Sequence, residues 1–404
     1  MPWRETCVMD ERMSFIVDVQ RGEASVAELC RRYGISRKSG YKWLERHAAG
    51  GIEALLDRSR ARHHHGNAVT AAVAAAVLDV RHRHPTWGPK KIRAWLLRHQ
   101  PGVMWPAEST IGVLLERRGL VRHRRRRRHV PSCMVPLSAC DVPNAVWGAD
   151  FKGWFVLGNG KRCDPFTLSD LATRYVLRLQ ALERPTGALV WPLFDAAFRE
   201  FGLPSVIRSD NGAPFASVAA GGLSRLAVKL IKAGVMPERI EPAKPQQNGC
   251  HERMHRTLKA EATQPPGYDA RAQQRRFDAF RSEFNEERPH EALGQDVPAD
   301  HYRPSERRYS GRLREPEYGD DQEIRRVRSS GEIKWAGERI FISEALIGEP
   351  VGLHEIGDGL WLIHYGPIEL GSIDHKGRFK RFAGGARAKP QRQPPGQSVT
   401  HVAG

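Results

Sequence analysis

The 404-residue sequence has few cysteines, and none of its six forms a CxxC pair with another. Scattered cysteines argue against a zinc ribbon and against a disulfide framework, and they favour a reducing compartment. No apolar signal-peptide core occurs near the N-terminus, and no uncharged apolar run approaches the length of a membrane span. We therefore expect a cytoplasmic protein with no membrane partner.

Acidic residues are also scarce relative to basic ones. The 46 Asp and Glu are outnumbered by 64 Lys and Arg, which gives a net charge of +18. Residues 1–149 alone carry 26 Lys and Arg against 13 Asp and Glu. Such an excess indicates a polyanionic partner, because bound cations release the counterions of a nucleic acid. We expect a nucleoid-associated protein whose N-terminal part binds DNA.

Changes in composition and periodicity predict a multidomain chain. An all-α N-terminal part, an α/β core and a small SH3-like β-barrel are expected, because helical periodicity gives way to mixed elements and then to short strands between turn signals. Five strands are predicted in the barrel, at "EIRRV", "RIFIS", "PVGLHEI", "LWLIHYG" and "IELGSID". The predicted segments are a helix-turn-helix domain over 1–60, a second helical module with an arginine-rich arm over 68–130, the catalytic core over 140–305, the barrel over 320–385 and a disordered tail over 386–404.

The helix-turn-helix prediction depends on capping residues. Ser25 with Glu28 resembles a capping box, Gly34 suits a sharp turn, and Ser36 can cap the next helix. The apolar core of this domain is predicted from Val26, Leu29, Ile35, Tyr41 and Leu44. Three basic residues at the start of the second helix are the predicted DNA contacts, namely Arg37, Lys38 and Lys42. The alternative is a basic helical hairpin with no role in DNA binding.

The second module is predicted to contain three helices. These are Val69–Arg83, a helix with Pro89 in its first turn, and one that ends at Gly119. A run of arginines follows, and like charges so close together would repel one another in a free helix. We expect an extended arm that binds DNA phosphates through Arg124, Arg125, Arg126, Arg127 and Arg128. A merely solvated charge run is the alternative.

The core is predicted to contain three strands, a helix and a fourth strand, with the hairpin turn signal "GNGK" after the first strand. The helix is expected over about Thr186–Phe201, with Pro192 marking either its true start or a kink. This order is that of a ribonuclease-H-like sheet, in which the first and fourth strands are parallel neighbours. That arrangement would place Asp150, in the first strand, beside Asp210, at the end of the fourth.

A third acidic residue follows in a predicted helix. Glu252, Arg256 and Lys259 have the spacing that puts side chains on one helix face. Three carboxylates that converge could hold two metal ions and stabilise both the attacking and the leaving oxygen at a phosphodiester. Each acid taken alone is also explained structurally, because Asp210 lies in a common turn sequence and Glu252 could form a surface ion pair.

The stretches around these acids resemble the D-D-E core of retroviral integrases and of the related bacterial insertion-sequence transposases. "SDNG" and "PQQNGCHER" are similar to the second and third motifs of that group. The resemblance covers nearly the whole chain, since helix-turn-helix modules in front and a small β domain behind are typical of the transposases. The separation of Asp210 from Glu252 is longer than in integrases, and the extra residues are expected in "SVAAGGLSRLAVKLIKAG".

The resemblance implies roles for particular residues. Asp150, Asp210 and Glu252 would be the catalytic, metal-binding acids of a DNA transposase, with two Mg²⁺ (or Mn²⁺) ions per site and no organic cofactor. Asn248, Arg256 and Lys259 would contact the DNA end. Asn211 and Gly212 would shape the turn that holds Asp210. The protein would bind the terminal inverted repeats of its element, cut 3′ ends and join them to target DNA, as a homo-oligomer on DNA.

Three alternatives remain from the sequence. A ribonuclease-H-like nuclease would cut without joining, although two helix-turn-helix modules favour sequence-specific DNA binding. A catalytically silent DNA-binding regulator derived from a transposase is disfavoured by the presence of all three acids. An RNA-binding protein would be expected to present aromatic platforms for stacked bases, and the sequence lacks them.

Overall fold

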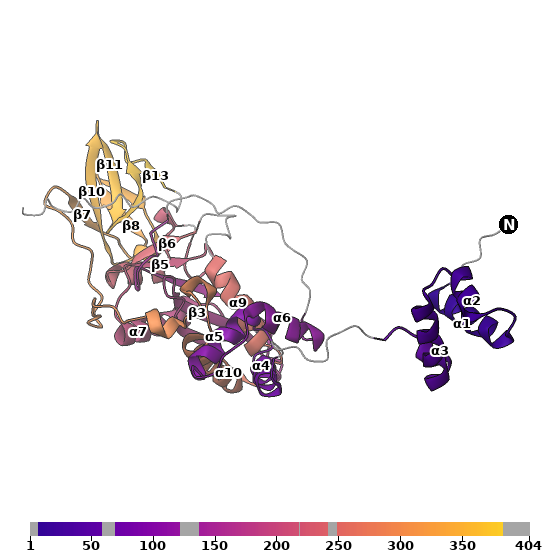
Figure 1. The fold of residues 1–404 in the computed structure, drawn as a ribbon. Helices are drawn as coiled ribbons and strands as arrows, with labels where there is room; N and C mark the ends of the chain where they lie inside the picture. Colours follow the sequence, from indigo (N-terminus) through magenta and orange to yellow (C-terminus); the bar gives the residue numbers. More distant parts are fainter. Residues whose placement is uncertain (1–6, 59–68, 122–136, 218, 241–248, 383–404) are drawn as a thin grey trace, which may run out of the picture. The chain divides into compact units, whose positions relative to one another are not determined.

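The structure is a computed structural model that describes residues 7–58, 69–121, 137–217, 219–240 and 249–382 (Figure 1). It divides into two compact units, Met1–Thr70 and Ala71–Gly404. Among the described residues, no helix has both the length and the apolar character needed to cross a membrane. The arginines Arg124, Arg125, Arg126, Arg127 and Arg128, the residue Asn248 and the predicted tail lie outside the described residues.

The first unit has the predicted helix-turn-helix. Ser25 accepts a hydrogen bond from the Glu28 N–H, and Ser36 accepts one from the Ser39 N–H, so both predicted caps are confirmed. Gly34 has the left-handed φ of +64° that the sharp turn requires. Its helices, shown in indigo in Figure 1, are α1 (Val8–Arg21), α2 (Val26–Arg32), α3 (Arg37–Gly50) and the 3-10 turn η1 (Ile52–Leu55).

The core of this unit differs from the prediction at one position. Tyr41 was expected inside, but its side chain is 59% exposed. The preceding residue, Gly40, faces α2 instead, where a Cβ would lie 2.5 Å from Cys30 Sγ and 3.1 Å from Phe15 Cζ. Because α2 and α3 approach this closely, the buried position accepts only glycine, and Tyr41 is turned outward. The fully buried side chains are Phe15, Ile16, Leu29, Cys30 and Leu55.

The second unit begins with the predicted three-helix module. Its helices are α4 (Ala71–Arg83), α5 (Pro89–His99) and α6 (Glu108–Arg117). Gly119 has a left-handed φ of +67° just after the last of them, as expected for a helix end. Three tryptophans dominate the core of the module, and the buried side chains around them come from all three helices.

A six-stranded mixed sheet forms the centre of the second unit. Antiparallel pairing joins β1 to β3 and β3 to β4, whereas β1 pairs in parallel with β5 and β5 with β6. The short β2 extends the β3 edge, and the "GNGK" hairpin turn is confirmed. This is a ribonuclease-H-like order, with strands β1 (Val146–Phe151), β2 (Phe155–Val156), β3 (Arg162–Asp170), β4 (Val176–Leu182), β5 (Val206–Ser209) and β6 (Met236–Arg239).

Helices connect and cover this sheet. The crossover helix α7 (Gly187–Phe201) is confirmed where it was predicted, and it continues through Pro192. The proline removes one N–H from the helix hydrogen bonds, and its ring lies on the exposed side of the helix. The others are α8 (Arg225–Lys232), α9 (Gly249–Ala262), α10 (Ala270–Ser282) and α11 (Pro298–His301), with short turns η2 (Ala220–Gly222), η4 (Glu283–Glu287, a π-helical turn) and η5 (Glu291–Leu293).

The C-terminal part is all-β, as predicted, and is drawn in yellow in Figure 1. Five strands were expected and seven are present, in a five-stranded antiparallel sheet and a two-stranded hairpin. The two strands that were not predicted, β8 and β13, are four and three residues long and rich in charged residues. Their alternation of apolar and polar residues is therefore weak. The strands are β7 (Glu323–Arg326), β8 (Glu332–Trp335), β9 (Glu338–Phe341), β10 (Pro350–Gly357), β11 (Leu360–Tyr365), β12 (Ile368–Ile373) and β13 (Phe379–Arg381), with the turn η6 (Glu344–Leu346).

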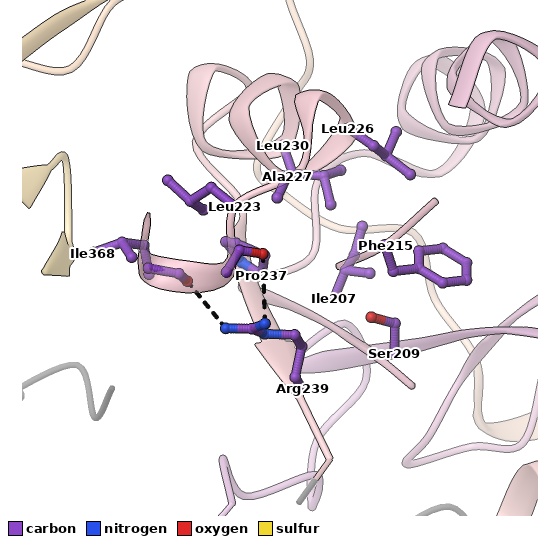
Figure 2. A pocket seen from close by; sticks show the side chains of 12 residues that line it. Ile207, Ser209, Phe215, Leu223, Leu226, Ala227, Leu230, Pro237, Arg239 and Ile368 are labelled. Atoms are coloured by element: carbon purple, nitrogen blue, oxygen red, sulfur yellow. Dashed lines mark hydrogen bonds between the residues drawn. The ribbon is translucent and has the colours of Figure 1, made fainter. Parts of the chain in front are cut away.

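The residues between β5 and β6 join the β part to the sheet. Buried side chains of η2 and α8 share one apolar cluster with the interior of the β part. Figure 2 shows Arg239 below this joint, where its guanidinium donates hydrogen bonds to the carbonyl oxygens of Gly221 (3.0 Å) and Gly222 (3.4 Å). Ile368 of β12 reaches the same small cavity. The stretch "SVAAGGLSRLAVKLIKAG" thus supplies a docking surface for the β part.

Candidate active site

Two of the predicted acids lie at the ends of neighbouring parallel strands. Ala149 of β1 is paired with Ser209 of β5, and the next residue along the chain is an aspartate in both cases, Asp150 near the end of β1 and Asp210 just after β5. Parallel neighbours lie about 4.8 Å apart, so both carboxylates leave the sheet at the same edge. The predicted adjacency of the first and fourth strands is therefore confirmed. The fourth predicted strand is β5, because the two-residue strand β2 was not predicted as a separate strand.

Asp150 is held by its surroundings at a largely buried position. Its side chain is 14% exposed, and its Oδ1 accepts a hydrogen bond from the Phe151 N–H at 2.7 Å. The Thr167 hydroxyl donates to the Asp150 carbonyl oxygen at 3.0 Å. Lys152 lies nearby, and burial lowers its pKa, with a further lowering by Lys259 and an opposing effect of Asp150. Lys152 therefore lies near this carboxylate, and Lys259 lies near Lys152.

A tight turn fixes Asp210. The Gly212 N–H donates to Asp210 Oδ1 at 3.1 Å, and the Asn211 amide donates to the Ile240 carbonyl oxygen at 2.7 Å. A Cβ at Gly212 would lie only 3.0 Å from Asp210 Oδ2, so a side chain there would press on the carboxylate. Asn211 and Gly212 thus occupy the positions in the turn that the sequence assigned to them.

Helix α9 presents Glu252 on its outer face. Glu252, Arg256 and Lys259 are all exposed, whereas the opposite side of the helix is buried against the sheet. The helix therefore separates a charged face from a buried one, which is the arrangement predicted from the spacing of these three residues.

Two histidines attach the inner face of α9 to the sheet. His251 Nε2 lies 3.2 Å from the Ser169 hydroxyl, and His255 Nε2 lies 2.9 Å from the Thr167 hydroxyl. Burial, with Arg174 nearby, lowers the pKa of His251 to about 4. Burial, followed by His251 and Lys152, lowers the pKa of His255 to about 2. Both rings are therefore neutral at physiological pH and act as packed, hydrogen-bonded contacts.

Gly148 makes room for this helix. A Cβ at Gly148 would lie 2.2 Å from His251 Cε1 and 2.8 Å from Leu171 Cδ2. Gly148 precedes Asp150 by two residues, so both positions face the same side of β1. The backbone of β1 and the His251 ring are therefore in direct contact, and the absence of a side chain at Gly148 sets the distance between strand and helix.

The helix that bears the third carboxylate contacts the site, but the three acids do not form a ready metal site in the described residues. His255, one turn after Glu252, places its Nδ1 3.9 Å from Asp150 Oδ2. Among the described residues, no group of three or more His, Cys, Asp or Glu side chains is placed to hold an ion. The site thus contains an aligned pair of aspartates, and Glu252 lies on the exposed face of the helix that packs beside them.

Several residues of the site were not predicted. Gly148, Lys152, Thr167, His251 and His255 shape the surroundings of Asp150, and none was proposed from the sequence. Only the two histidines could have been recognised from the sequence, because their i, i+4 spacing in "CHERMHR" puts them together on one face of the helix. The predicted contacts in the first unit, Arg37, Lys38 and Lys42, are exposed at the start of α3.

The strand order and the positions of the acids define a ribonuclease-H-like core of the integrase type. Four family models match the chain. They describe an integrase core domain over residues 233–298, a homeodomain-like domain over 39–115, a helix-turn-helix domain over 11–63 and the C-terminal domain of IS481 family transposases over 322–380.

Curated relatives come from bacterial insertion elements. An uncharacterized 31.7 kDa protein of insertion element IS407 from Burkholderia multivorans is 29% identical over 236 residues, which cover 56% of this chain and 79% of the relative. An uncharacterized 39.2 kDa protein of IS476 from Xanthomonas euvesicatoria is 28% identical over 57% of this chain, and the match spans 64%, less than two thirds, of that relative. Together these matches support an insertion-sequence transposase with an integrase-like core.

Solved structures that resemble the chain are retroviral integrases. The HTLV-2 integrase catalytic core in complex with magnesium is 14% identical, with a TM-score of 0.32, and the match covers 40% of this chain and 97% of that one. A simian T-cell lymphotropic virus intasome bound to a PP2A regulatory subunit gives a TM-score of 0.35 at 14% identity, with 72% and 97% covered. The likeness is remote, and the fold assignment rests on the strand order of the sheet.

Proposed function

We propose that this chain is a DNA transposase that binds the terminal inverted repeats of its element and catalyses metal-dependent 3′-end cleavage and strand transfer. One observation carries the proposal. Parallel pairing of β1 with β5 puts Asp150 beside Asp210 at one edge of the sheet, and α9, which bears Glu252, is packed against the same region through His255.

The donor set fits the implied metal. All three side chains offer carboxylate oxygens, which are the ligands Mg²⁺ prefers, and Mn²⁺ accepts them as well. Asp150, Asp210 and Glu252 would hold two such ions, which when bound supply the positive charge that stabilises attacking and leaving oxygens at a phosphodiester. The turn at Gly212 orients one of these ligands, and the Phe151 N–H orients another.

The exposed face of α9 would position the DNA end. Arg256 and Lys259 follow Glu252 on that face, and both can donate to phosphate oxygens beside the reacting bond. Lys152 lies near Lys259 and adds positive charge. In the first unit, exposed Arg37, Lys38 and Lys42 at the start of α3 suit groove contacts in the terminal repeats. We expect a homo-oligomer to bring two element ends together.

A strand-transfer assay tests the proposal. Labelled duplexes carrying the sequences that border the gene are incubated with the protein, Mg²⁺ and a supercoiled target. We expect cut 3′ ends and joined products from the wild-type protein, and neither product from Asp150→Asn. Binding of the same duplexes should survive that substitution, since Asp150 is not among the DNA-contacting residues. Cutting without any joined product would favour a nuclease over a transposase.

A DNA-binding regulator is the second candidate, because the described residues contain no assembled three-residue metal site. Such a regulator would act through the helix-turn-helix unit alone. Repression of a reporter placed behind the element's terminal sequence would then be the same for wild type and Asp150→Asn, and no cleavage would occur with either. Loss of cleavage in Asp150→Asn, with wild-type cleavage present, excludes the regulator.

A further inference from the structure

A basic cavity lies between the α4–α6 module and the integrase core, beside the candidate active site. Its volume is about 370 Å³, and it is lined by parts of four segments: the start of α5, the end of β3 with the following turn, the helix α9, and residues 284–292. Volumes of this size are typical of sites that hold a ligand. The cavity shares Arg256 with the exposed face of α9 that bears Glu252.

Polar contacts join the module to the core. His84 Nδ1 lies 2.9 Å from Glu283 Oε1, Lys90 donates to Glu291 at 2.9 Å, and Arg98 donates to Asp300 at 3.0 Å. The first two contacts flank Lys91 and bring it over the core, where it lines the cavity, whereas Arg98 lies at the far end of α5.

Cations in the wall outnumber anions. Five cationic side chains line the cavity, namely Lys91, Arg174, Arg253, Arg256 and Arg288. The two lining carboxylates are already engaged: Glu291 accepts from Lys90, and Asp170 accepts from the Asn144 and Thr173 backbones. Glu261 is likewise engaged with Arg288, at 2.8 Å.

Four of these cations have no carboxylate partner within the part of the chain that the structure describes. Lys91 donates to the Pro289 carbonyl oxygen, Arg174 to Cys250 Sγ and Arg253 to the Gly249 carbonyl oxygen. Burial, with Arg288 nearby, lowers the pKa of Lys91 to about 8 against the opposing effects of Glu261 and Glu291. A partly buried ammonium beside guanidinium groups is unfavourable unless an anion joins them.

A buried histidine in the wall also lacks a partner. His290 lines the cavity, and its Nε2 is buried with no hydrogen-bond partner among the described residues. Burial, with Lys91 and Arg288 nearby, lowers the pKa of His290 to about 3. Buried polar atoms are normally satisfied, so His290 is a strained member of the wall, but as a neutral ring it is not a contact for an anion.

We propose that this cavity binds a backbone phosphate of DNA lying along α9, with Lys91, Arg174 and Arg253 as its principal contacts. The inference rests on the proposed function and extends it, because it makes the α4–α6 module part of the DNA-binding surface of the core. A phosphate here would replace the repulsion among the cations by charge-assisted hydrogen bonds. DNA held at this point would continue past Arg256 toward Glu252.

A DNA strand suits the cavity better than a free nucleotide. Arg253 and Arg256 are exposed, so the cavity opens onto a surface along which a strand can run. Its aromatic wall residue, Phe284, is 5% exposed and packs against Phe280 and His290, which leaves no ring face free for a base. Inorganic phosphate would make the same charge contacts, and the experiment below distinguishes it from DNA.

The salt dependence of DNA binding tests the inference. Fluorescence anisotropy of a labelled 30-base-pair duplex is measured with the full chain over about 0.05–0.3 M NaCl. Each phosphate contact contributes a slope of about −0.9 to log K against log [salt], so losing one weakens binding about eightfold at 0.1 M salt. We expect this change from Lys91→Gln and also from Arg253→Gln, whose exposed side chain can be shortened without unfolding the protein.

The matched control is Arg98→Gln, which removes a cation and a docking ion pair from the same helix but does not line the cavity. It should leave the slope unchanged. An unchanged slope in both Lys91→Gln and Arg253→Gln overturns the inference, and so does an equal change in Arg98→Gln. Calorimetric binding of inorganic phosphate that is lost in Lys91→Gln, together with an unchanged DNA slope, would assign the cavity to a free anion instead.

Failure of this inference and failure of the proposed function give different results. If the wild-type protein cuts and joins DNA while Lys91→Gln and Arg253→Gln bind duplexes with the wild-type slope, only the cavity assignment is wrong. If the slopes change as expected while no preparation of the wild-type protein cleaves DNA, the cavity is a phosphate site on a protein that lacks the proposed chemistry.

Discussion

Substitution of Gly148 by alanine would test how β1 and α9 set the geometry of the candidate site. The new Cβ would meet His251 Cε1 at 2.2 Å, and the gap must open by about 1.2 Å to reach the 3.4 Å of an ordinary contact. The ring cannot swing away easily, because it is buried and its Nε2 is engaged with Ser169. Leu171, 2.8 Å away, blocks movement in another direction.

The displacement has two expected consequences. Overpacking of this kind costs about 1–3 kcal/mol of unfolding free energy. If α9 carries a metal ligand, as proposed, a shift of about 1 Å in this helix reduces turnover about 100-fold. We therefore expect Gly148→Ala to remain folded and to bind duplex DNA as the wild type does, while cleavage of labelled element ends falls about 100-fold.

A double-mutant cycle identifies the cause. His251→Ala removes the ring that the new methyl group would meet, so the double variant Gly148→Ala/His251→Ala should be less impaired than the two single effects predict. Urea unfolding and single-turnover cleavage are measured for all four proteins. Additive losses in both measurements would show that strand and ring are not coupled, and the explanation of Gly148 would be refuted. Gly88→Ala, where a Cβ meets nothing within 4 Å, is the control for adding a methyl group.

Three further predictions concern other parts of the chain. In the first unit, Gly40→Ala should lower the unfolding free energy by about 1–3 kcal/mol, because its Cβ would lie 2.5 Å from Cys30 Sγ; an unchanged melting temperature contradicts this. Lys232→Ala breaks a largely buried ion pair with Glu349 (2.7 Å) and should cost about 1–3 kcal/mol in urea unfolding, whereas no loss would mean that the pair does not hold the β part on α8. Lys91 is protonated below its pKa of about 8. Above that pH, Lys91 must take up a proton before it can bind a phosphate as a cation. The affinity for duplex DNA should then fall as the pH rises from 8 to 9 in the wild type but not in Lys91→Gln. Equal pH profiles in the two proteins would contradict the assignment. The charged groups that surround Lys91 are Arg288, Glu261 and Glu291.

Local signals in the sequence predicted the elements well. Ser25 and Ser36 cap their helices as expected, because a capping hydrogen bond depends on residues only two or three positions away. The strand order of the core also followed from the sequence, since a right-handed crossover leaves few alternatives once the strands and the helix are placed. The adjacency of Asp150 and Asp210 is a consequence of that order.

Contacts between distant segments were not predictable in the same way. Tyr41 and Gly40 are neighbours in sequence, and only the approach of Cys30 and Phe15 decides which of them faces inward. The docking of Lys91 over α9 depends on pairs such as His84 with Glu283, which are 199 positions apart. The histidines beneath Glu252 were visible as a pair, but their partners Thr167 and Ser169 come from another strand.

The most direct test of the central claim is the number of divalent ions that the three acids bind. Mn²⁺ binding is measured by electron paramagnetic resonance with the full chain bound to a duplex that carries an element end. We expect two ions per active site in the wild type, and weakened binding of at least one of them in each of Asp150→Asn, Asp210→Asn and Glu252→Gln, with DNA affinity preserved. Wild-type stoichiometry and affinity in all three variants would contradict the claim that these carboxylates form one metal site.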